Sequence, residues 1–446
     1  MEPHVREAVD ERSEKNSGFD PNIVDIVGLI PTQQSTSGIL STSSPTTDSV
    51  SHSASGMTSY DNNAASTGEP INADQSEAHE SQAETMEDDS SSIRKLEKKL
   101  RTSWEYINKA RKLAAGTQRE LTDKLCAHCN SNDMSIIILG SLARNEYTDG
   151  SDIDWFLLID SQVDYRHQKC FSDIQKIINK VAKMSVGREG IFDVMVFSTS
   201  LVHNIGNELD TNNNLARRMA LLIEAHVVGN KEAYERVLDN LLSRYLYEDH
   251  SLWNSFEDHV PKFLLRDFTR FWNTMHVSTQ YKDWSRQGEG SVIRFIKLLM
   301  SRKLLYVSSC LVCFSFHTNF TVDQRKQLFN GRNNENLKKV IEHMKSMFQK
   351  PPLEIVADVL VRHSHLKEMA KTIIGSYDNF LKLLMNNRDE LKGLAVNEAN
   401  DNLTYKEACD FMENFHKGLM CLIYDESSGL KNLTENYINN VGLWNN

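Results

Sequence analysis

The stretch of sequence that decides the fold runs over residues 138–158 and reads ILGSLARNEYTDGSDIDWFLL. An apolar run ends in Gly140-Ser141, a polar loop follows, and a second apolar run opens on Asp152-Ile153-Asp154. The β-branched run before Gly140, from Ser135, and the apolar run Ile153–Ile159 are both short and bounded by polar residues, which is typical of buried strands. The stretch therefore predicts two strands joined by a polar loop.

Gly140 and Ser141 stand where the first strand ends, and we expect a helix to follow them. Backbone N–H groups at the start of a helix point outward and bind phosphate. Glycine lets the backbone approach a ligand without a Cβ, and Ser141 adds a hydroxyl donor. These two residues are therefore candidates for nucleotide-phosphate binding.

Three aspartates form the second half of the candidate site. Asp152 and Asp154 are two residues apart on a strand, so their side chains leave the same face. Two adjacent carboxylates repel each other unless a cation lies between them, and Mg²⁺ (or Mn²⁺) prefers such oxygen ligands. Asp193 lies in a third predicted strand, Ile191–Phe197, where an unpaired charge would be costly. A neighbouring strand would bring it to the same metals, which predicts a two-metal site.

This arrangement resembles the DNA-polymerase-β-like nucleotidyltransferase superfamily. Its signature is a strand, Gly-Ser, a short spacer, Asp-x-Asp on the next strand and a third acidic residue on a later one. The match also includes Ala143 and Arg144 after Gly-Ser, and it covers roughly residues 135–197. The resemblance implies that Asp152, Asp154 and Asp193 bind the metals and catalyse transfer of a nucleoside monophosphate from an NTP such as ATP to an acceptor, with release of pyrophosphate.

Only helical patterns follow the third strand, as in uridylyltransferase-type members, whose helical region closes the cleft over the nucleotide phosphates. Residues 262–303 hold nine Lys or Arg against three acidic residues. Lys297 lies in an otherwise apolar run, so it must either reach solvent or meet an anion. We expect triphosphate contacts from Lys297, Arg266, Arg270 and Arg302. The alternative for each is a solvated helix face with structural ion pairs.

The charge of the chain is unevenly distributed. Residues 1–93 hold 17 acidic and 3 basic residues, a balance of −14, so the remainder of a chain with net charge −11 carries +3. Residues 1–92 are rich in Ser, Thr and acidic residues and poor in large apolar ones, which predicts disorder. The apolar patch Ile23–Ile30 is a docking motif for a protein partner, an intramolecular strand or an incidental stretch. No long basic stripe with interleaved aromatics marks a nucleic-acid surface.

The sequence thus predicts an α/β (α+β) protein with a small mixed sheet and a large all-helical region. We divide it into a disordered acidic tail (1–92), a nucleotidyltransferase domain (93–205), a helical domain that closes over the nucleotide (206–350) and a C-terminal helical extension (351–446). No signal peptide and no membrane-spanning apolar run is visible, so we expect a cytoplasmic protein.

Other functions remain open at this point. The acceptor is a protein, a small molecule, a second nucleotide or an RNA end, and a protein is slightly favoured. A non-catalytic nucleotide sensor or interaction module would use the same pocket. Arg270 and His276 match the loose pattern of helical ribonucleases, although their neighbours suggest a core helix. Two C-x-x-C pairs, one beginning at Cys126 and one at Cys310, have the spacing of zinc ligands. The second pair lies in an apolar run, where buried cysteine is ordinary.

Overall fold

A computed structural model describes residues 91–128, 131–182, 191–254 and 258–439. The predicted tail, with its patch Ile23–Ile30, lies outside these residues, apart from Ser91 and Ser92. The Ser91 side chain caps a helix that begins at Ser92. Within the described residues, none of the helices is long and apolar enough to cross a membrane.

The sheet has four strands in the order β3-β2-β1-β4. β1 pairs antiparallel with β2 and β4, whereas β2 pairs parallel with β3, so the sheet is mixed, as predicted. The strands are β1 (Met134–Leu139), β2 (Asp154–Ile159), β3 (Val194–Phe197) and β4 (His226–Val228). The last strand was not predicted, because only helices were expected after the third strand. The helix ends at Ile223, where Glu224 leaves helical geometry with φ −149°.

Helices make up most of the rest of the described chain, and most of them follow the sheet, as the sequence predicts. They are α3 (Ser92–Leu100), α4 (Glu105–Leu125), α5 (Gly140–Ala143), α6 (Tyr165–Val181), α7 (Ser198–Val202), α8 (Asn212–Ile223), α9 (Glu232–Tyr247), α10 (Lys262–Ser285), α11 (Ser291–Lys297), α12 (Lys303–Cys313), α13 (Ser315–Asn319), α14 (Val322–Leu328), α15 (Asn334–Phe348), α16 (Pro352–Arg362), α17 (Lys367–Asn386), α18 (Arg388–Gly393), α19 (Leu403–Ile423) and α20 (Leu430–Tyr437).

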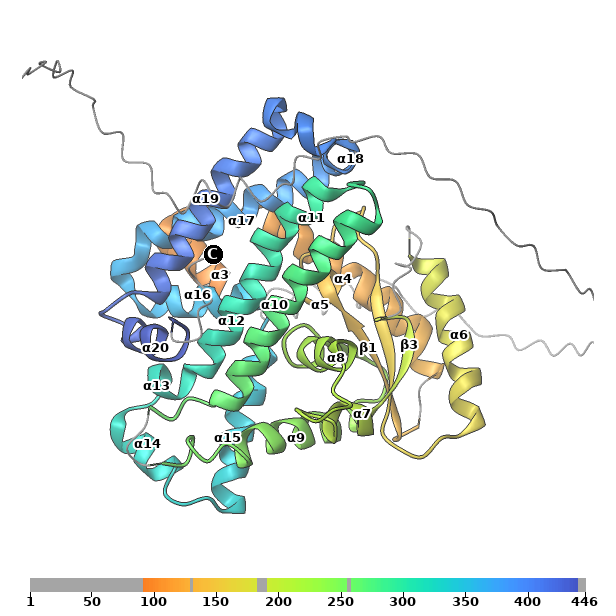
Figure 1. Ribbon diagram of the computed structural model, residues 1–446, viewed down its shortest axis with the longest axis vertical. Helices are drawn as coiled ribbons and strands as arrows, with labels where there is room; N and C mark the ends of the chain where they lie inside the picture. Colours follow the sequence, from red (N-terminus) through yellow and green to blue (C-terminus); the bar gives the residue numbers. More distant parts are fainter. Residues whose placement is uncertain (1–90, 129–130, 183–190, 255–257, 440–446) are drawn as a thin grey trace, which may run out of the picture.

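The two faces of the sheet belong to different cores. Ile136 and Ile138 of β1 pack with residues of α4 and α6, whereas Ile137 and Leu139 join the core of the helical region. Successive residues of a strand alternate between faces, so Asp154 shares the face of Phe156, which lies in the helical-region core. The carboxylate pair is thereby directed toward the helices. In Figure 1 the sheet lies to the right with α6 outside it, and the helical region lies to the left.

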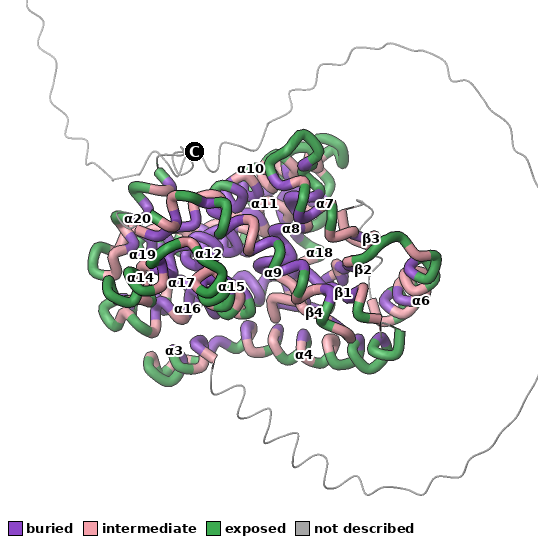
Figure 2. The backbone as a smooth tube through the Cα atoms, turned by 90° about the horizontal axis from the view of Figure 1, so that it is seen from below, coloured by how far each residue is buried: buried purple, intermediate pink, exposed green. Residues whose placement is uncertain are grey.

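The first described helices pack against late ones. α3 lies against α16, and α4 lies against α17. Glu354 of α16 accepts a hydrogen bond of 2.7 Å from the Ser92 amide and forms an ion pair with Arg111 of α4. Figure 2 shows buried residues gathered in the middle of the molecule, with α3 and α4 along one edge. Segments from both ends of the described chain therefore share one core.

A π turn interrupts the helical stretch that begins at Ser291 and ends at Cys313. This turn, η2 (Leu298–Arg302), connects α11 to α12. Side chains five residues apart on an α-helix point about 140° from each other, but an i→i+5 turn brings them toward one side. Lys297 and Arg302 are separated by such an interval, so the π turn places both cations on the same side of the helix.

Candidate functional site

The turn between β1 and α5 requires glycine. Gly140 has φ 67°, and a Cβ at this position would lie 2.8 Å from Oδ2 of Asp154. Both the backbone conformation and the available space exclude a side chain. The register, in which Leu139 pairs with Asp154, brings the Asp154 carboxylate against the main chain of Gly140. Helix α5 is a single turn, so it offers N–H groups but only a small helix dipole.

Ser141 follows Gly140 in this turn. The residue is half-buried, and its carbonyl oxygen accepts a 2.8 Å hydrogen bond from the Glu146 amide. The loop that leads on to the aspartates is tied by Thr148 and Ser151, whose hydroxyls lie 2.9 Å apart. This fixed loop places Asp152 next to Asp154.

Asp152 and Asp154 form the acidic centre. Ile153 between them is buried on the α4 and α6 side of the sheet, so the two carboxylates share the opposite face. Burial raises the pKa of the Asp154 carboxyl to about 7; the negative charges of Asp152 and Glu224 act in the same direction, and Arg144 and Arg302 oppose them. A bound cation would favour the charged carboxylate and so oppose this shift.

Glu224 is a neighbour of this centre that the sequence did not reveal. It follows α8 directly and forms an ion pair with Arg144, whose Nε also donates a 2.9 Å hydrogen bond to Glu146. These carboxylates raise the pKa of Arg144 and keep the buried guanidinium charged. The charge of Arg144 is thus neutralised by Glu146 and Glu224. The only sequence signal for Glu224 is an acidic residue between two apolar runs.

Lys297, the last residue of α11, and Arg302, the last residue of the π turn, have the acidic centre among their charged neighbours. Burial lowers the pKa of Lys297 to about 8, and Arg388 adds to this effect, whereas Asp152 and Asp154 oppose it. Burial also lowers the pKa of Arg302, with Arg144 next in effect and Glu224 and both aspartates opposing. Two of the predicted phosphate ligands therefore lie in the electrostatic field of the aspartate pair.

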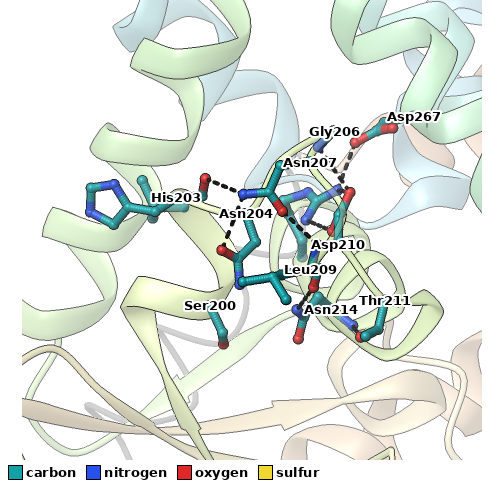
Figure 3. A network of polar contacts seen from close by, with 12 residues as sticks. Ser200, His203, Asn204, Gly206, Asn207, Leu209, Asp210, Thr211, Asn214 and Asp267 are labelled. Atoms are coloured by element: carbon teal, nitrogen blue, oxygen red, sulfur yellow. Dashed lines mark hydrogen bonds and ion pairs between the residues drawn. The ribbon is translucent and has the colours of Figure 1, made fainter.

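The other two predicted cations lie elsewhere. Arg266 is exposed on α10, and Arg270 Nη1 forms an ion pair of 2.9 Å with Asp210 Oδ2. Asp210 also pairs with Arg218, which in turn bonds Asp267 at 2.7 Å. Figure 3 shows Asp210 and Asp267 in this network, next to the loop that contains Gly206 and Leu209. Arg270 therefore connects α10 to that loop, and its 2.9 Å ion pair is with Asp210 and not with Asp152 or Asp154.

Contrary to the prediction, Asp193 does not lie within a strand but directly precedes β3, and it lies next to Trp155 of β2. Its amide donates a 2.7 Å hydrogen bond to the Trp155 carbonyl, and its φ is 64°. Burial raises the pKa of its carboxyl, and the Trp155 indole opposes the shift. Trp155 belongs to the α4 and α6 side, where it stacks on Phe171 at 5.2 Å. No cluster of three metal-ligating side chains is present in the described part of the chain.

The histidine and cysteine candidates, those for a ribonuclease or a zinc site, lie mostly in packed, buried surroundings. His276 packs against Trp272 with ring centroids 4.3 Å apart, and burial, with the charge of Lys303, lowers its pKa to about 4. Cys310 and Cys313 are buried in α12, where burial raises the pKa of both thiols. The partner of Cys126 in the other pair, residue 129, lies outside the described residues.

Comparison with known proteins gives one match. Residues 119–187 match the family model of the nucleotidyltransferase domain. The matched segment contains Gly140, Ser141, Asp152 and Asp154, and it ends before Asp193. No curated protein matches the chain, and neither does any solved structure.

Proposed function

Because the chain carries a nucleotidyltransferase domain of the DNA-polymerase-β-like kind, we propose that it transfers a nucleoside monophosphate from an NTP to an acceptor and releases pyrophosphate. The observation that supports this best is the packing of Asp154 against Gly140, with Asp152 beside it and two cations opposite. Carboxylates and cations at one site match a ligand that consists of a divalent metal and a polyphosphate.

Asp152 and Asp154 would hold the divalent cation, Mg²⁺ or Mn²⁺. Two carboxylates on one face supply the hard oxygen ligands that such a cation prefers. Burial, which raises the pKa of Asp154, also makes two negative charges without a cation costly at this place. When bound, the metal supplies charge neutralisation at the phosphates and a more acidic acceptor hydroxyl.

The phosphates would contact the groups that face this pair. The Ser141 hydroxyl and the amides of the Gly140 turn donate hydrogen bonds from the sheet side, and Lys297 and Arg302 supply positive charge from the helical side. The acceptor oxygen attacks the α-phosphorus, and the bond to the bridging oxygen of the β-phosphate breaks. We assign the hydroxyl proton to Asp193, which requires that its carboxylate turn from Trp155 toward the other aspartates.

The backbone at Asp193 is strained, as residues at functional sites often are. A positive φ at a residue other than glycine costs about 1 kcal/mol or more, and Asp193 has φ 64°.

For the acceptor, a protein hydroxyl is the first to test, because the sequence offers no long basic stripe with interleaved aromatics, which would mark a nucleic-acid surface.

Metal-dependent pyrophosphate release tests the proposal. The protein is incubated with each NTP and Mg²⁺, with and without cell lysate as the source of acceptor, and pyrophosphate is measured. The wild type and the control Asp123→Asn, an exposed carboxylate on α4, should release it, whereas Asp152→Asn should not. Binding of an NTP without release of pyrophosphate would support the alternative of a non-catalytic nucleotide sensor. RNA cleavage without NTP would instead support the ribonuclease alternative.

A further inference from the structure

Arg388 brings the C-terminal helical extension to the site. It is the first residue of α18 (Arg388–Gly393), and its side chain lies over the loop before Asp152. A Cβ built on Gly150 would be 2.7 Å from the Arg388 Cδ and 3.2 Å from its Nε. Gly150 therefore leaves the space that the stem of Arg388 occupies.

The guanidinium of Arg388 has no acidic partner within the described residues. Its Nη1 is buried without a hydrogen bond. The neighbouring Glu390 does not neutralise it, because the Glu390 carboxylate accepts hydrogen bonds from Asn387 at 3.0 Å, Asn402 at 2.9 Å and Thr404 at 3.2 Å. A buried donor on a charged group without a partner is costly, so a ligand that supplies an anion would stabilise this arrangement.

Three cations gather near the acidic centre. Arg302 has Glu224 and Asp154 among its charged neighbours, and Lys297 has Asp152, Arg302 and Arg388 among its own. α18 packs against α11, the helix that ends in Lys297. Within the part of the chain that the structure describes, Arg388 has a buried Nη1 without a hydrogen-bond partner. Its side chain lies at Gly150, two residues before Asp152.

We propose that Arg388 binds the terminal phosphate of the NTP. This inference rests on the proposed function: the α-phosphate would lie at Asp152 and Asp154, where the reaction occurs, so the rest of the chain of phosphates extends along Lys297 toward Arg388. The planar guanidinium suits a terminal phosphate, which it binds with two parallel hydrogen bonds. The C-terminal extension thereby selects triphosphates over diphosphates.

The test compares affinities for nucleotides with three, two and one phosphates. Calorimetry with Mg²⁺ uses an NTP analogue with a non-cleavable α–β bridge, then the matching NDP and NMP. Arg388→Gln should weaken NTP-analogue binding about 10- to 100-fold, as expected for lost charged hydrogen bonds, and leave NDP and NMP binding unchanged. The control Lys392→Gln removes an exposed charge one turn along the same helix and should change none of the three affinities.

A second variant displaces Arg388 without altering its charge. Gly150→Ala puts a methyl group where the Arg388 stem lies, so it should lower the NTP-analogue affinity in the same direction while the melting temperature stays near that of the wild type. Unchanged analogue affinity in Arg388→Gln, or equal losses for all three nucleotides, would overturn the inference. Failure of the proposed function is distinguishable, because the wild type would then release no pyrophosphate from any NTP with Mg²⁺ and lysate, whatever its affinity for the analogue.

Discussion

Asp154→Asn should stabilise the metal-free protein at alkaline pH. The folded state holds the pKa of the Asp154 carboxyl at about 7, against an ordinary value of 3.8. The native state therefore binds an extra proton between these values, and the free energy of unfolding falls as the pH rises through that window. At 1.36 kcal/mol per unit, the full shift corresponds to about 4 kcal/mol.

The measured gain should be smaller, because Asp154 is only half-buried in terms of accessible surface and solvent screens the charges. We expect about 2 kcal/mol, which corresponds to a rise in Tm of roughly 3 °C for about 340 folded residues. Asparagine resembles the protonated carboxyl, so the difference from the wild type should be present at about pH 8 and nearly absent below about pH 4.

Thermal unfolding followed by fluorescence at several pH values, with a chelator and then with Mg²⁺, measures this effect. Mg²⁺ should raise the Tm of the wild type and leave that of Asp154→Asn unchanged. Asp123→Asn, which removes an exposed carboxylate of α4, should behave as the wild type. A variant that is less stable than the wild type at alkaline pH, or a gain that does not depend on pH, would refute the reasoning.

Three other predictions concern separate parts of the chain. Asp193→Ala should lower kcat more than NTP affinity, as measured by steady-state kinetics; collapse of affinity with normal turnover at saturation would contradict its role. Lys297→Met should weaken NTP binding by roughly 1–3 kcal/mol in calorimetry without loss of thermal stability, and unaltered affinity would make Lys297 structural. Deletion of residues 1–90 should leave Tm and pyrophosphate release nearly unchanged, provided that Ser91 and Ser92, which both bond Glu354, are retained.

The acidic centre could be predicted because its signals are local. Gly140-Ser141 and Asp152-Ile153-Asp154 each lie at the end of an apolar run, and strand periodicity alone places both aspartates on one face. The first three strands and the mostly helical remainder followed from the same kind of periodicity. Strand β4 (His226–Val228) was missed because it has three residues and follows directly on a helical pattern.

The cations could be predicted only as a set. Whether Arg270 meets a phosphate or Asp210 depends on a contact across 60 residues of chain, and no local pattern encodes it. The π turn that brings Lys297 and Arg302 to one side results from a shift in backbone hydrogen bonding, which leaves no recognisable sequence signal. Arg388 reaches the site from the C-terminal extension for the same kind of reason, since tertiary packing alone brings α18 to the Gly150 loop.

Transfer of the α-phosphate tests the central claim most directly. An NTP labelled at the α-phosphate and the same NTP labelled at the γ-phosphate are incubated with the wild-type protein, Mg²⁺ and lysate. Nucleotidyl transfer predicts that label from the α-position becomes attached to an acceptor and label from the γ-position appears as pyrophosphate, and that Asp152→Asn abolishes both. Attachment of the γ-label, or no transfer of the α-label from any NTP, would contradict the claim.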